Sequence, residues 1–171
     1  LRLVGSEMCI RDSHYLDASI LAKTAAMLGK SDDAGYYSGL KDKIAAAFVA
    51  EFYDKESKTF GSQTADAMAL DFGLVPAGDE KAVSDAIVRN MKEKYDGFMH
   101  TGIFGLGRIG QALSRFGNSK MAWDMFTKTG ENSFAYMWTD ADATSLWEIL
   151  PVNGQSKETV SYTHLTLPTI L

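Results

Sequence analysis

Trp147 and Glu148 stand side by side near the C-terminal end of the sequence, in a segment from Phe134 to Leu150 that is rich in aromatic and acidic residues. An indole can stack on the apolar face of a pyranose ring, and a carboxylate beside it can activate water. The pair therefore has the composition of a site that cleaves a glycosidic bond. A helix with one buried and one solvated side chain gives the same two-residue pattern, so the pair alone does not separate catalysis from structure.

A second pattern with chemical meaning runs from Gly105 to Gly110 and matches G-x-G-x-x-G. Such glycines let a pyrophosphate approach a helix N-terminus, provided that a strand precedes them and an acidic residue ends a second strand roughly 20 residues later. Gly102 interrupts the preceding segment, and Asp124 follows too early, in a segment of helical composition. A NAD-dependent oxidoreductase is thus an alternative without the βαβ context that it needs.

Charge and composition narrow the classes of partner. The net charge of −5 leaves no basic footprint for nucleic acid, and no apolar run approaches the roughly 20 residues of a membrane span. No His or Cys cluster suggests a metal, and no cofactor is expected. Cys9 is the only cysteine, so the sequence leaves the cellular compartment open.

Both ends of the chain have a pattern that is foreign to a folded domain. Met8 to Asp12 can be encoded as ATG TGT ATA AGA GAC, and the reverse complement of that string encodes Val160 to His164. The two segments are compatible with opposite strands of one inverted repeat, which resembles the transposon end used in DNA library preparation. The flanking segments resemble translated adapter sequence. We therefore predict that residues 1–13 and 159–171 are non-native, and that 14–158 carry the fold.

Apolar residues recur at helical spacing along most of that central segment. A first helix is expected over residues 16–28, closed by Gly29, and a second over 31–48 with an acidic first turn. Residues 52–61 are expected to form two short strands on either side of a polar turn. Four further helices are expected over residues 64–72, 79–94, 106–116 and 119–126.

About six helices joined by short links predict an all-α fold of antiparallel helix pairs. Pairs that recur along a chain are also found in α-solenoids, where aromatic residues serve as core. A non-catalytic helical-pair scaffold is therefore a second alternative to an enzyme.

Several segments, taken in order, are together similar to the catalytic domain of bacterial α-L-rhamnosidases, glycoside hydrolase family 78. They extend over most of the central segment, and the last of them contains Trp147 and Glu148. The resembling segments are 62–70, 72–76, 100–105, 122–129, 134–137 and 143–148.

The resemblance implies a partial (α/α)6 barrel, about half of a twelve-helix toroid, with residues 14–158 as its C-terminal half. It implies an inverting hydrolase that releases terminal α-L-rhamnose from glycans or glycosides, with Glu148 as general base. Trp147 would then belong to the sugar-facing wall, and His100 and Trp138 would be pocket contacts. The general acid is expected upstream of this chain, which would leave the chain inactive alone. Other (α/α)6 glycosidases remain possible, because the barrel hosts several sugars.

Overall fold

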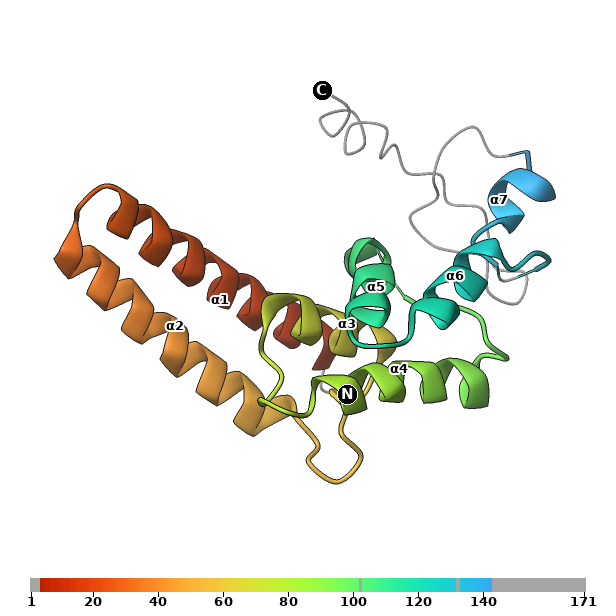
Figure 1. Ribbon diagram of the computed structural model, residues 1–171, viewed down its shortest axis with the longest axis horizontal. Helices are drawn as coiled ribbons and strands as arrows, with labels where there is room; N and C mark the ends of the chain where they lie inside the picture. The colour runs from red at the N-terminus through yellow and green to blue at the C-terminus, as the bar shows by residue number, and fades with distance from the viewer. Residues whose placement is uncertain (1–3, 102, 132, 143–171) are drawn as a thin grey trace.

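The computed structural model describes residues 4–101, 103–131 and 133–142. Figure 1 shows two long helices that form a hairpin projecting from a body of shorter ones. The helices of the described residues are α1 (Val4–Met27), α2 (Ser31–Phe52), α3 (Gln63–Phe72), α4 (Glu80–Lys94), α5 (Ile103–Arg115), α6 (Ser119–Thr127) and α7 (Tyr136–Thr139).

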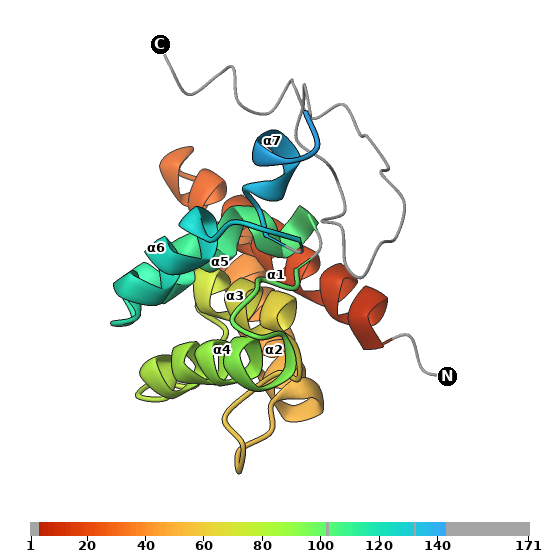
Figure 2. The same cartoon turned by 90° about the vertical axis from the view of Figure 1, so that its right-hand side faces the viewer.

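The helices pack as consecutive pairs, α1 with α2, α3 with α4, and α5 with α6, while α3 also packs against α5 and α1. Figure 2 shows α3 and α5 in the middle of the body, with α4 on one side and α7 on the other. The expectation of an all-α fold built from antiparallel helix pairs is therefore confirmed.

Local chemistry explains where several helices begin and end. The hydroxyl of Ser62 accepts a hydrogen bond from the backbone N–H of Ala65 at 3.2 Å, which satisfies a free donor at the start of α3. Gly73 ends α3 in the left-handed conformation, with φ of 70°. Lys92 and Lys94 lie in the last turn of α4, where the helix dipole favours positive charge.

Helix α2 runs four residues beyond the expected end, α5 begins three residues before the expected start, and α7 was not expected. Two other elements differ more. Helix α1 begins at Val4 and continues without a break across the boundary between residues 13 and 14, so the foreign origin of residues 1–13 stays a prediction. Arg11 of this helix lies over the ring of Phe52, 5.2 Å from its centroid. In place of the two short strands expected over residues 52–61, the structure has a single isolated antiparallel bridge between Asp54 and Thr59.

The core lies where the helix pairs meet. An aromatic cluster of Phe48, Tyr53 and Phe60 packs the end of α2 against the connection to α3, with ring centroids 5.0 to 5.4 Å apart. Aliphatic and sulfur-containing side chains fill the space between α3, α4, α5 and α6. The large residues that are fully buried there include Val83, Ile87, Met91, Ile109, Leu113 and Met125.

Candidate functional site

The connections between successive pairs, α2–α3, α4–α5 and α6–α7, alternate along the chain with the turns inside the pairs, and we call the end of the pairs that carries them the loop end. Arg89 near the end of α4 donates to the carbonyl of Ser57 at 3.0 Å. Lys128, directly after α6, donates to the carbonyl of Asp96 at 2.6 Å and lies 3.8 Å from the ring centroid of Phe98. These contacts join the connection α2–α3 to α4, and the connection α6–α7 to the connection α4–α5.

His100 lies at the loop end, in the connection α4–α5. Its side chain is exposed, and its ring stacks on the ring of Tyr95 with centroids 4.2 Å apart and planes 15° apart. Its backbone N–H donates to the side-chain oxygen of Gln63 at 2.8 Å. An exposed imidazole held at a fixed place can contact a ligand, and the predicted role of His100 as a pocket contact stays a prediction.

Gln63 and Tyr95 are residues of this arrangement that sequence reasoning did not single out. Gln63 occupies the first position of α3 and is buried, with 1% of its surface exposed. A buried amide at a helix start has no periodic signature. Its partners are 27 and 37 residues away along the chain, so nothing local in the sequence indicates them.

Trp138 lies in α7, beyond the connection α6–α7, with 48% of its surface exposed. Its ring meets the ring of Phe134 edge-on at 4.9 Å, and Phe134 meets Phe126 edge-on at 5.3 Å. The hydroxyl of Ser133 accepts from the backbone N–H of Tyr136 at 3.0 Å and fixes the start of α7. His100 and Trp138 therefore belong to two separate ring clusters.

Trp147 and Glu148 lie outside the described residues, so their predicted roles stay predictions. Asp140 and Asp142, the acidic residues that precede them, are both exposed. The hydroxyl of Thr139 donates to the carboxylate of Asp140.

Asp66 is the buried carboxylate nearest to the start of α3, with 1% of its surface exposed. It accepts from the backbone N–H of Phe60 at 2.6 Å and from the hydroxyl of Thr59 at 2.7 Å. Burial raises the pKa of Asp66 to about 6, although both hydrogen bonds act in the opposite direction. Because its oxygens point at the connection α2–α3 and away from solvent, Asp66 holds that connection in place.

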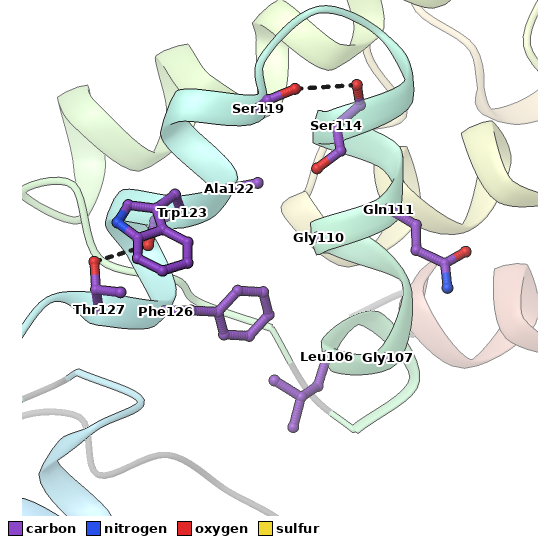
Figure 3. Close-up of a pocket in the computed structure, with 10 residues that line it drawn as sticks. All are labelled: Leu106, Gly107, Gly110, Gln111, Ser114, Ser119, Ala122, Trp123, Phe126 and Thr127. Atoms are coloured by element: carbon purple, nitrogen blue, oxygen red, sulfur yellow. Dashed lines mark hydrogen bonds between the residues drawn. The ribbon is translucent and has the colours of Figure 1, made fainter. Parts of the chain in front are cut away.

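A groove of about 490 Å³ runs between α5 and α6, and Figure 3 shows its lining. Two of its hydroxyl groups bond to the backbone: Ser119 donates to the carbonyl of Ser114, and Thr127 to that of Trp123. Apolar side chains dominate the remainder, chiefly Leu106, Trp123 and Phe126. Neither His100 nor Trp138 lines this groove, so it is separate from the predicted sugar contacts.

The glycine motif lies inside α5, which begins at Ile103. A Cβ atom on Gly105 would lie 2.9 Å from Cβ of Thr101, and one on Gly110 would lie 2.8 Å from Cε2 of Phe126. These two glycines therefore allow α5 to pack closely, while a Cβ on Gly107 would meet nothing within 4 Å. The motif follows α4 and its connection, without a preceding strand in the described residues, and it is helical from its first glycine on. The strand–turn–helix context that a dinucleotide site needs is therefore missing there, which contradicts the phosphate-binding interpretation.

The described residues lack both a cluster of metal ligands and a membrane-spanning helix. Residues 4–101, 103–131 and 133–142 contain no group of three or more His, Cys, Asp or Glu placed to hold a metal ion. None of the helices formed by them is long and apolar enough to cross a membrane.

Residues 6–171 match the family described as the bacterial alpha-L-rhamnosidase 6 hairpin glycosidase domain. Among curated proteins, an alpha-L-rhamnosidase of Alteromonas sp. (strain LOR) is 27% identical over 133 residues. That match covers 76% of this chain and 14% of the relative, so the chain spans a small part of the relative's length.

Two solved structures have the same helix arrangement. The alpha-L-rhamnosidase from Dictyoglumus thermophilum superposes with a TM-score of 0.71 at 33% identity, over 79% of this chain and 15% of that one. The Streptomyces avermitilis alpha-L-rhamnosidase, complexed with L-rhamnose, superposes with a TM-score of 0.73 at 28% identity, over 81% and 13%. The helix pairs are thus part of an (α/α)6 barrel, as the sequence resemblance implied.

Proposed function

Because this chain belongs to the six-hairpin glycosidase domain family of bacterial α-L-rhamnosidases, we propose that the protein containing it is an inverting hydrolase that releases terminal α-L-rhamnose from glycans or glycosides. The observation that carries the proposal is the family match, which extends over residues 6–171. The similar Streptomyces avermitilis structure was solved with L-rhamnose bound, which supports the choice of sugar.

In the proposed mechanism, Glu148 removes a proton from the water that attacks the anomeric carbon. Inverting glycosidases use two carboxyl groups about 6.5 to 9.5 Å apart, one to protonate the leaving oxygen and one to activate the water between them. We assign the second role to Glu148. The general acid is expected from a part of the domain that this chain does not cover, so the chain alone is expected to be inactive.

We propose that three aromatic side chains bind the sugar. Trp147, adjacent to the base in sequence, would stack on an apolar face of the pyranose, as indole rings do with sugars. His100 and Trp138 would contact the sugar from the loop end, where both side chains are exposed. Their position in two separate ring clusters is compatible with contacts to different parts of the glycoside.

Glu148→Gln in the full-length protein tests the mechanism, with an aryl α-L-rhamnoside as substrate. The substitution keeps the size of the side chain and removes the base, so kcat should fall by roughly 10² to 10⁴. Glu131→Gln, at an exposed position in the connection α6–α7, is the matched control and should leave kcat unchanged.

Two further measurements test the role of Glu148 and the inverting mechanism. Azide needs no base, so it should restore turnover of the Glu148→Gln variant and give a rhamnosyl azide of inverted configuration. Proton NMR of the first sugar released by the unsubstituted enzyme should show inversion. Full activity of the variant would remove Glu148 from the role of base, and a retained configuration would contradict the inverting mechanism.

A further inference from the structure

Gln63 connects three elements at the loop end through one buried side chain. Its Nε2 donates to the side-chain oxygen of Asn90 in α4 at 3.1 Å, and its Oε1 accepts from the backbone N–H of His100 at 2.8 Å. Gln63 itself is the first residue of α3. A buried amide is costly unless it is hydrogen-bonded, so these two partners account for a polar residue in this place.

The direction of both hydrogen bonds follows from the backbone. The N–H of His100 can only donate, so the atom of Gln63 that faces it must be the oxygen. The amide nitrogen of Gln63 then faces Asn90, whose oxygen must accept. Asn90 therefore fixes the orientation of the Gln63 amide, and the amide fixes the backbone of His100.

The rest of the connection α4–α5 is held by other contacts. The N–H of Gly97 donates to the carbonyl of Met91 at 2.8 Å, and that of Phe98 donates to the carbonyl of Tyr95 at 2.7 Å. The side chain of Lys128 donates a hydrogen bond to the carbonyl of Asp96. These contacts fix the first half of the connection next to α4, whereas Gln63 acts on the half that carries His100.

We propose that Gln63 is a positioning residue for His100, holding the backbone of that residue at the start of α3 while Tyr95 holds its ring. The proposal rests on the proposed function, in which His100 contacts the sugar. An imidazole anchored at both its backbone and its ring is preorganised, so substrate binding does not have to order it. Gln63 therefore acts on substrate affinity without contacting the substrate.

A double-substitution cycle in the full-length enzyme tests this role. Gln63→Met keeps the length of the side chain and removes both hydrogen bonds, and it should raise KM for an aryl rhamnoside roughly 3- to 10-fold with little change in kcat. His100→Ala should raise KM at least as much. If Gln63 acts through His100, the double variant has the KM of His100→Ala alone, whereas independent effects would multiply and overturn the proposal.

Gln63→Glu gives a conservative comparison. Burial at this position favours the neutral carboxylic acid, whose carbonyl oxygen can accept from the N–H of His100 and whose hydroxyl can donate to the oxygen of Asn90. Its KM should therefore lie closer to the wild-type value than that of Gln63→Met. Equal KM values for the two variants would mean that the hydrogen bond to His100 is not what matters.

A readout without turnover separates this proposal from the proposed function. The rate at which diethyl pyrocarbonate modifies His100, followed by peptide mass mapping of the full-length protein, reports how the ring is held. Gln63→Met should accelerate that modification and leave His14, an exposed residue of α1, unaffected. His100→Ala could leave KM unchanged while Gln63→Met still accelerates the modification of His100. That result would contradict a contact between His100 and the sugar, and it would support the positioning of His100 by Gln63. An unchanged modification rate would overturn the positioning itself.

Discussion

Gly105 of α5 lies directly against the backbone of Thr64 in α3, so that a Cβ atom on Gly105 would be 3.1 Å from Cα of Thr64. A methyl group there would also lie 2.9 Å from Cβ of Thr101, which is closer than carbon atoms pack. The glycine thus sets how near the starts of α3 and α5 can come. Gln63 is the first residue of α3, and His100 lies shortly before α5 begins at Ile103.

Gly105→Ala should therefore lower the free energy of unfolding, by about 1 to 3 kcal/mol, because the added methyl forces α3 and α5 apart. Gly107→Ala is a matched control in the same helix, since its Cβ would meet nothing within 4 Å. It should raise the free energy of unfolding by about 0.5 to 1 kcal/mol through helix propensity alone. Urea denaturation followed by circular dichroism measures both, and equal effects would contradict the close approach.

Asp66 predicts a pH dependence of stability. Burial raises its pKa from the usual 3.8 to about 6, so the folded chain binds the proton more tightly than the unfolded chain. The resulting contribution to the free energy of unfolding is full below pH 3.8 and is lost as the pH rises through about 6, on the order of 3 kcal/mol. Asp66→Asn, which cannot ionise, should gain stability relative to the wild type over that interval in denaturation curves at successive pH values.

Asp79→Asn provides a control of opposite sign. Hydrogen bonds from Lys58 and then Tyr53 hold the pKa of Asp79 below its usual value, so this carboxylate stabilises the fold at neutral pH. That contribution is lost as the pH falls. The deficit of Asp79→Asn should therefore shrink with acidification, and parallel curves for both variants would contradict these assignments.

Among the residues that the structure describes, the buried hydroxyl of Thr101 has no hydrogen-bond partner. Thr101→Val replaces it by a methyl group of similar shape and should raise the free energy of unfolding by about 1 kcal/mol. Thr59→Val removes a hydroxyl that donates to Asp66 and accepts from the N–H of Gly61, and should lower it by about 1 to 3 kcal/mol. Thermal melts of the two variants should shift in opposite directions.

The tip of the α1–α2 hairpin exposes large apolar side chains, with Met27 at 87% and Leu28 at 67% exposure. We expect the isolated chain to self-associate through this surface. Sedimentation velocity at increasing concentration should show larger species, which the double variant Met27→Lys, Leu28→Gln should reduce. Ala26→Lys, which adds the same charge beside it, should not, and a wild-type chain that stays monomeric would contradict the expectation.

Helix positions were predictable from the sequence because their causes are local. The cap at Ser62, the left-handed glycine at Gly73 and the apolar spacing in between act within a few residues. The packing role of the glycine motif was not predictable, because it depends on contacts with other helices. Gly105 packs against α3, and Gly110 packs against the ring of Phe126. Gln63 has the same property, since its partners come from α4 and from the connection α4–α5.

The family resemblance predicted His100 and Trp138 as pocket contacts. Their side chains are exposed in the structure, and their contact with a sugar stays a prediction. How each ring is held depends on Tyr95 and Phe134, and no spacing rule indicates those contacts. Trp147 and Glu148 remain predictions from the sequence resemblance.

The two ends of the helix pairs carry connections of unequal length. Residues 28–30, 73–79 and 116–118 turn the chain at one end, whereas residues 53–62, 95–102 and 128–135 connect the pairs at the loop end. The short turns leave the two helices of a pair close in sequence. The longer connections serve the core and the surface together, since Tyr53, Phe60 and Met99 are buried whereas His100 is exposed. The loop end is therefore expected to tolerate change at its exposed positions and not at its buried ones. Exchanging 95–102 between relatives while keeping Met99 should retain the helices and is expected to alter glycoside selectivity.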